Sequence, residues 1–329
     1  MNENENLFEA YLHQYDDAAW GRAIDALRPS IHPVDRTATR IWFAFFPLAL
    51  LEALRDATDR SWLIRKLQVL GRWELNGQID TSHRFLYGHR WWPEVKQAVI
   101  ALARSDRPPK SLELADLVLE IARGVALTAA IDSSLLAGIT AVALMTLQQA
   151  GAEVFEATPG AVSLDPGVRR RTPEQVLRAR ARDDAQGMFG FLRGEKKIWT
   201  VTFDEQDPAG SFPLINSQHL TTAAAADARD HRARDPRCTE GPIPVECRSA
   251  SCGTCWVGVL GGAEKLSPVE ELERRRLKDF GYIDTDEAKP IIRLSCQAQA
   301  FGAVSIVIPP WNGTFGKYLE KRRQTAETK

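Results

Sequence analysis

Residues 245–262 read VECRSASCGTCWVGVLGG and hold three cysteines within nine positions. Four residues separate Cys247 from Cys252, two separate Cys252 from Cys255, and Cys296 follows after a further 40 residues in RLSCQAQ. The residues between the first three cysteines are almost all small, which lets the backbone approach a bound group closely. Thiols clustered in this way more often bind metal or do redox chemistry than form disulfides, provided that the compartment is reducing.

The spacing C-x4-C-x2-C with a distant fourth cysteine is the plant-type arrangement of [2Fe–2S] ligands. A tight loop must present three thiolates and many backbone N–H groups to one side of the Fe2S2 core, and a distant thiolate closes the other side. Gly253 is the best candidate for a backbone conformation that other residues avoid. We therefore expect one [2Fe–2S] cluster bound by Cys247, Cys252, Cys255 and Cys296. The loop residues expected to surround it are Arg248, Ser249, Ala250, Ser251, Gly253 and Thr254.

Other metal or redox sites fit this spacing less well. A zinc site favours two C-x2-C pairs or added histidines, and only one such pair is present. A Rieske centre needs two histidine ligands, whereas His219 and His231 precede the loop and lack that pattern. A thioredoxin-like C-x-x-C leaves Cys247 and Cys296 unexplained. The fifth cysteine, Cys238, is interpreted as a bystander near the cluster rather than as an alternative ligand.

The segment from Lys196 to Pro310 resembles a [2Fe–2S] ferredoxin with a β-grasp fold. The resemblance is carried by CRSASCGTC, by the strand–strand–helix pattern before it, and by LSCQAQ followed by VSIVIP. It implies the same four cysteine ligands. The segment LSPVEELERRRLKDFGYI between the third and fourth cysteines is closer to the helix-bearing loop of adrenodoxin-like ferredoxins, which place five residues rather than four between the first two cysteines. The resemblance is therefore to the superfamily, and residues 1–190 resemble no family that we recognise.

Alternation and turn signals outline the elements of this C-terminal domain, expected over residues 196–329. Strands are predicted over residues 196–204, 211–216, 256–260 and 304–309. Helices are predicted over residues 219–235 and 267–281, the second with Pro268 at its start and Gly281 at its end. This mixture predicts an α+β domain.

Residues 1–152 are predicted to form an all-α domain, so the fold class is multidomain, with a helical domain followed by the β-grasp domain. Pro93 is predicted to lie at the start of one helix. Ser111 is predicted to cap the next helix, with a break at Gly124, and an apolar helix is predicted from near Thr128 to Gly151. Six of the nine tryptophans lie in the first 92 residues. Most are interpreted as core residues, although a docking surface is the alternative.

Residues 153–195 are predicted to be a linker with one short helix. Thr172 is its expected N-cap, Pro173 its first-turn proline and Gln175 the capping-box partner. The segment is rich in arginine, namely Arg169, Arg170, Arg171, Arg178, Arg180 and Arg182. These arginines form either a solvated face balanced by Asp183 and Asp184 or an arm that grips an acidic partner subunit.

Other features carry less functional information. His83 and His89 are six residues apart, do not share a helical face and have no carboxylate or cysteine at ligand spacing, so no metal or haem site is expected there. Residues 41–51 are too short to span a bilayer. Residues 125–145 are long enough but carry Asp132, which favours a buried helix over a membrane span. No integral span is expected, while peripheral association with a membrane stays open.

Composition and charge exclude several classes of protein. The chain has 329 residues, 44% of them hydrophobic and 26% charged, which is enough for two domains with their own cores. The formal net charge of −1 removes the usual electrostatic argument for nucleic-acid binding. The N-terminal sequence MNENENLFEAYLHQYDD has no basic region followed by an apolar run, so no signal peptide is predicted. A cytoplasmic location is expected.

The expected function is one-electron transfer. No residue resembles a catalytic acid, base or nucleophile, and neither a G-x-G-x-x-G fingerprint nor a P-loop is present, so no catalytic residue is predicted. From Glu195 onward the chain has 19 basic and 19 acidic residues, unlike free ferredoxins that use an acidic surface for transient docking.

We therefore expect an electron-transfer subunit of a larger oxidoreductase, for example a hydrogenase, attached through the helical domain and the arginine-rich linker. One alternative is a redox or iron sensor that signals through the state of the cluster. The other is a self-contained oxidoreductase with a second cofactor in the helical domain.

Overall fold

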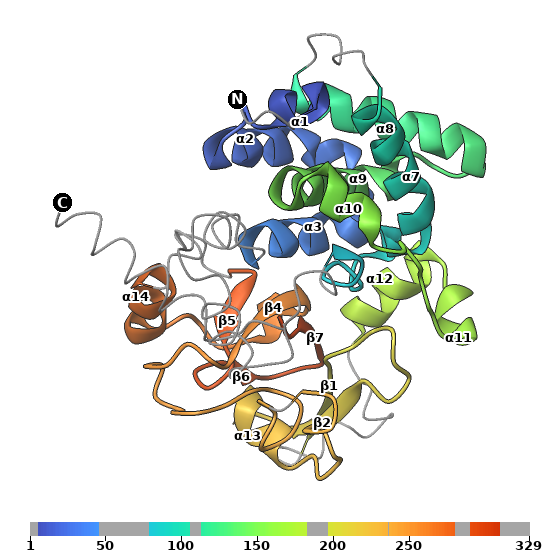
Figure 1. Ribbon diagram of the computed structural model, residues 1–329. Helices are drawn as coiled ribbons and strands as arrows, with labels where there is room; N and C mark the ends of the chain where they lie inside the picture. Colours follow the sequence, from blue (N-terminus) through green and yellow to red (C-terminus); the bar gives the residue numbers. More distant parts are fainter. Residues whose placement is uncertain are drawn as a thin grey trace, which may run out of the picture. The chain divides into compact units, whose positions relative to one another are not determined.

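The computed structural model describes residues 6–45, 79–105, 113–182, 197–235, 237–279 and 290–309. These residues fall into two units, the first ending at Arg169 and the second beginning at Arg170 (Figure 1). Within the described residues, no helix combines the length and apolar character needed to cross a membrane. The domain boundaries predicted at residues 152 and 195 stay predictions.

The first unit is helical throughout its described residues. Its elements are α1 (Leu7–Leu12), α2 (Asp17–Leu27), η1 (Arg28–Ser30), α3 (Pro33–Phe45), η2 (Tyr87–Trp91), α7 (Trp92–Ala103), α8 (Leu114–Ala129), α9 (Ser134–Ala150), α10 (Ala152–Ala157) and α11 (Pro166–Arg169). The all-α prediction is confirmed, and Pro93 lies in the first turn of α7 as expected.

Helix α9 supplies the centre of the helical core, because it is buried along nearly its whole length. Trp20, Trp42 and Trp92 are also buried, which confirms the core interpretation for these three tryptophans, and Trp91 is half-buried. The tryptophans at positions 62 and 73 lie outside the described residues.

Residues 125–145 do not form one helix, contrary to the prediction. Helix α8 continues through Gly124 and ends only where Ala130 adopts a left-handed backbone with φ of 54°. Glycine inside a helix costs only about 1 kcal/mol, and the buried residues that follow it in α8 offset that cost. Asp132 then accepts a hydrogen bond of 2.8 Å from the backbone N–H of Ser134, where α9 begins. The predicted cap Ser111 lies outside the described residues.

A buried carboxylate ties three parts of the helical unit together. Asp80 accepts hydrogen bonds from the Trp92 indole at 2.8 Å, from the Lys96 ammonium at 2.9 Å and from the Gly160 backbone N–H at 2.7 Å. Lys96 also donates to the Thr158 carbonyl at 2.8 Å. These contacts satisfy a buried ion pair, which would otherwise be costly. Burial raises the pKa of Asp80, but these donors outweigh it and hold the pKa below its ordinary value.

The second unit is built on a five-stranded mixed sheet with strand order β2-β1-β7-β4-β5. Its strands are β1 (Ile198–Thr202), β2 (Ser211–Ile215), β4 (Trp256–Gly261), β5 (Ile292–Leu294) and β7 (Val304–Val307). Strands β1 and β7 are parallel, and the other neighbours are antiparallel. A separate ribbon pairs β3 (Gln218–His219) with β6 (Gln299–Ala300). The predicted strands and the α+β class are confirmed.

Among the described residues of this unit, three helices accompany the sheet, namely α12 (Pro173–Ala181), α13 (Leu220–Ala225) and α14 (Glu271–Asp279), with the short turn η4 (Ala263–Lys265) after β4. Two of them differ from the prediction. Helix α13 ends at Ala225 instead of continuing to residue 235, because the acidic and basic side chains that follow bind neighbouring turns. Helix α14 begins at Glu271, three residues after Pro268. The carbonyl groups of Ser267 and Pro268 accept hydrogen bonds from Arg293 instead of continuing the helix. Gly281 lies outside the described residues.

Helix α12 belongs to the second unit. Thr172 caps it, and the capping box with Gln175 is formed as predicted. Arg180 makes a two-pronged ion pair of 2.8 Å with Glu205, which also accepts a hydrogen bond of 2.6 Å from Ser305 in β7. The helix approaches β4 so closely that a Cβ atom on Gly261 would lie 2.7 Å from that of Arg180. Arg180, one of the six arginines of the predicted linker, is therefore buried inside this unit.

Candidate metal centre

Three of the four predicted ligands lie on a loop that leads directly into β4. Within this loop Arg248, Ala250 and Gly253 all have a left-handed backbone, with φ of 54°, 60° and 66°. Alternation of left-handed and other conformations turns successive backbone N–H groups toward one side, which makes a concavity suited to an anion. Ala250 is buried, so its small side chain fills the interior of the loop.

The fourth predicted ligand is brought to this loop by the sheet. Trp256 in β4 pairs with Leu294 in β5, and the backbone N–H of Ser295 donates to the Cys255 carbonyl at 3.0 Å. Cys255 therefore lies beside Cys296, although 40 residues separate them in the sequence.

The four thiols are arranged as two pairs. Cys255 and Cys296 share a side-chain hydrogen bond, and so do Cys247 and Cys252. No three His, Cys, Asp or Glu side chains among the described residues are placed to hold a single metal ion. Two pairs fit a binuclear centre instead, because each iron of an Fe2S2 core takes two thiolates besides its two sulfides.

Comparison with known proteins bears on the same segment. Residues 219–300 match the family model of the 2Fe-2S iron-sulfur cluster binding domain. This part of the chain is a [2Fe–2S] ferredoxin domain. It binds a [2Fe–2S] cluster and serves electron transfer. Neither the curated proteins nor the solved structures contain a match to the chain. The family match includes all five cysteines and stops short of the helical unit.

Backbone N–H groups of the ferredoxin domain point at the sulfur atoms. Cys247 Sγ accepts from the N–H groups of Ser249 and Cys252, each at 3.4 Å, and Cys252 Sγ accepts from that of Thr254 at 3.4 Å. Donors of this kind stabilise thiolates and the negative charge of a cluster. The loop therefore has the polarity that an anionic iron–sulfur group needs.

The same contacts change the acidity of the thiols. Burial raises the pKa of Cys247, but hydrogen bonds from Ser251, Ser249 and Cys252 outweigh it and lower the pKa to about 6. The hydrogen bond with Cys255 lowers the pKa of Cys296 to about 7, and that same bond, together with burial, raises the pKa of Cys255. One thiol of each pair is thus poised to be a thiolate at neutral pH, the form that binds metal.

Cys238 has a different environment. Its buried thiol donates to the Pro242 carbonyl at 3.2 Å, and burial together with nearby Asp235 raises its pKa to about 12. A thiol that stays protonated is a poor metal ligand. This placement agrees with the bystander interpretation, which stays a prediction.

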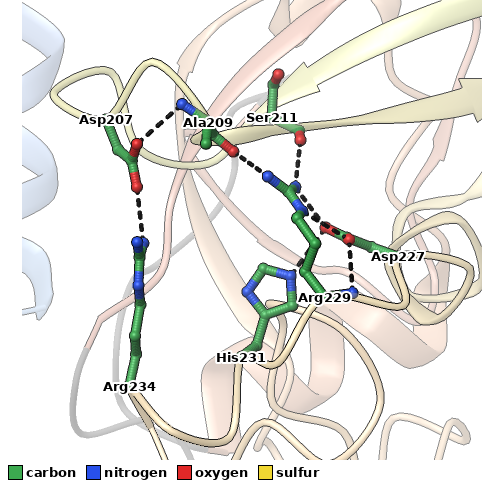
Figure 2. Close-up of polar contacts among 7 residues, drawn as sticks. All are labelled: Asp207, Ala209, Ser211, Asp227, Arg229, His231 and Arg234. Atoms are coloured by element: carbon green, nitrogen blue, oxygen red, sulfur yellow. Dashed lines mark hydrogen bonds and ion pairs between the residues drawn. The ribbon is translucent and has the colours of Figure 1, made fainter.

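The segment between α13 and the cysteine loop is held by a polar cluster that sequence reasoning missed (Figure 2). Arg229 donates to the carbonyls of Ala209, in the turn before β2, and of Ser211, the first residue of β2, and Arg234 binds Asp207 at 2.7 Å. His231 contacts Asp227 at 2.9 Å. Hydrogen bonds from Arg229, offset in part by burial, lower the pKa of Asp227 to about 2. The alternating acidic and basic residues of DARDHRARD were the available signal, and they indicated a helix instead.

Two further sequence predictions can be located. Arg248 is exposed and pairs with Glu240 at the surface of the loop. His83 and His89 lie in the helical unit with both rings buried and their Nδ1 atoms 3.0 Å apart, so the fold unites two histidines that helical periodicity separates. The charged groups that act on His89 are Arg84, Arg90 and Asp80, and no carboxylate or thiol joins the two rings to make a metal site among the described residues.

Proposed function

We propose that Cys247, Cys252, Cys255 and Cys296 bind the [2Fe–2S] cluster and that the chain passes single electrons through it. The observation that carries this assignment is the gathering of these four thiols into two pairs against one loop of inward-facing N–H groups. When bound, the cluster supplies a site that accepts and releases one electron. The chain's own residues hold it, limit its contact with water and stabilise its charge.

Replacing single cysteines tests the ligand assignment. Cys296→Ser should lower the iron content and change the electron paramagnetic resonance spectrum of the reduced protein, because a ligand of one iron is altered. Cys238→Ser is the matched control and should keep about two irons per chain with an unchanged spin-half signal. Equal loss of iron in both variants, or zinc in place of iron after anaerobic preparation, would contradict the assignment.

We further propose that the chain is the iron–sulfur subunit of a larger oxidoreductase, such as a hydrogenase. The balanced charge of the region from Glu195 supports a partner that is held permanently rather than met by electrostatic steering. The helical unit and the exposed arginines around α12, among them Arg178 and Arg182, are the proposed attachment surfaces. Purification of the native chain should yield a co-eluting redox enzyme, and isolation as a free, fully active carrier would refute this proposal.

A further inference from the structure

Two of the four thiols accept hydrogen bonds from side chains in addition to those from the backbone. At Cys296 the donor is the amide of Gln297, whose Nε2 lies 3.3 Å from Sγ and 3.1 Å from the Cys296 carbonyl oxygen. An amide nitrogen carries two hydrogens, so both contacts can be made at once.

At Cys247 the donors are hydroxyl groups. The backbone N–H of Ser249 donates to Cys247 Sγ at 3.4 Å, and the Oγ atoms of Ser249 and Ser251 lie 3.0 Å from each other, which places both hydroxyl groups beside this sulfur. Since both serines are exposed, neither is required to fill the interior of the loop. Each thiol pair therefore has one cysteine with side-chain donors: Cys247 in the pair with Cys252, and Cys296 in the pair with Cys255.

We propose that Ser251 and Gln297 set the reduction potential of the cluster by donating hydrogen bonds to the sulfur atoms of Cys247 and Cys296. One-electron reduction adds one negative charge to the site, and a donor to a ligand sulfur stabilises the more negative state more strongly. Both donors therefore raise the potential. This inference rests on the ligand assignment proposed above.

Side-chain donors differ from the backbone N–H groups in one useful respect, because substitution can remove them without changing the course of the loop. Ser251→Ala removes only a hydroxyl, and Ser251→Thr keeps it. Gln297→Met keeps the length of the side chain but donates nothing. Gln299→Met is the matched control, since Gln299 lies two residues further on in β6 and is half-buried like Gln297.

The experiment is a potentiometric titration of the full-length, cluster-loaded protein, followed by its visible absorbance. Ser251→Ala and Gln297→Met should each shift the ratio of reduced to oxidised cluster on the order of tenfold toward the oxidised form, which is about 59 mV for one electron. Ser251→Thr and Gln299→Met should keep the wild-type potential. A double variant with both donors removed should show the larger fall.

Iron and sulfide counts separate the failure of this inference from failure of the ligand assignment. A variant with a full cluster and an unchanged potential overturns the role of that donor. If Gln297→Met loads no cluster, Gln297→Glu replaces it; this variant loses the donor, adds a negative charge and should lower the potential further. A Cys296→Ser variant that keeps the full iron content of the wild type would instead refute the ligand assignment.

Discussion

At the scale of single residues, the left-handed backbone conformations of the cysteine loop are the feature that is hardest to predict from the sequence. A left-handed φ was predictable at Gly253, because glycine adopts it freely. It was not predictable at Arg248 or Ala250, where a side chain costs roughly 1 kcal/mol or more in this conformation. The small size of the loop residues could be read from the sequence, but the order of backbone conformations depends on how the loop folds around its thiols.

Ala250 offers a direct test of that loop conformation. Ala250→Val should prevent cluster assembly, because a buried β-branched side chain is strongly disfavoured at a φ of 60°. Ala250→Gly, which tolerates this φ, should load as much iron and sulfide as the wild type and unfold at equal or higher urea concentration. Iron and sulfide analysis with the visible spectrum decides the matter. Full loading of the valine variant would show that the loop does not require this backbone.

The histidine pair predicts a pH dependence of stability. Burial lowers the pKa of His89 to about 4, helped by Arg84 and Arg90, and lowers that of His83 well below its ordinary value. The unfolded chain therefore binds more protons than the folded chain below about pH 6.5. The stability that the two neutral histidines contribute is present in full above that pH and is lost as the pH falls toward 4.

Urea unfolding of the helical unit, followed by far-ultraviolet circular dichroism, measures this loss. Between about pH 7 and pH 5 the free energy of unfolding should fall by about 2 kcal/mol for each histidine. His89→Gln keeps a neutral polar side chain and should remove about half of the fall. An unchanged pH dependence in this variant would mean that the histidine pair is not the source.

At the scale of elements, the sequence predicts which helices and strands exist better than where they end. The C-terminal strands and α12 follow from alternation and from a capping box, which are local signals. The early end of α13 and the late start of α14 depend on contacts that are distant in sequence. Arg293, for example, binds the carbonyls before α14 from a strand that follows it, and no local pattern marks that interaction.

The ion pair between Arg293 and Glu273 fixes α14 to β5, three residues before Cys296. Both side chains are almost completely buried, and Glu273 also accepts from the Leu294 backbone N–H at 2.8 Å. Glu273→Gln would leave a buried guanidinium without its counter-charge, so we expect a loss of about 3 kcal/mol in stability. Glu271→Gln, an exposed change on the same helix, is the control.

Chemical denaturation followed by cluster absorbance measures both variants. We expect the midpoint for Glu273→Gln to move to a clearly lower denaturant concentration while that for Glu271→Gln stays near the wild type. Equal midpoints for all three proteins would mean that the buried pair contributes little beyond an apolar contact.

At the scale of the whole chain, the bound cluster was easier to predict from the sequence than the partner to which the helical unit attaches. Four of the five cysteines after residue 237 indicated the cluster and the fold around it, because few folds present thiols at the spacing C-x4-C-x2-C with a distant fourth cysteine. The helical unit contains no comparable constraint. Its buried Asp80 network and histidine pair are assembled from residues far apart in the sequence, and helical periodicity identifies a core without naming a partner.

The docking of α12 affects how this electron-carrying module could be moved into another protein. A gene fragment cut at the start of the family match, or even at β1, would omit Arg180 and leave Glu205 and Ser305 facing a vacant site. The transplanted sheet would then hold a nearly buried carboxylate with no cation beside it. A fusion that links this domain to a new enzyme should therefore begin at Arg170. It then includes α12, whose Arg180 neutralises Glu205.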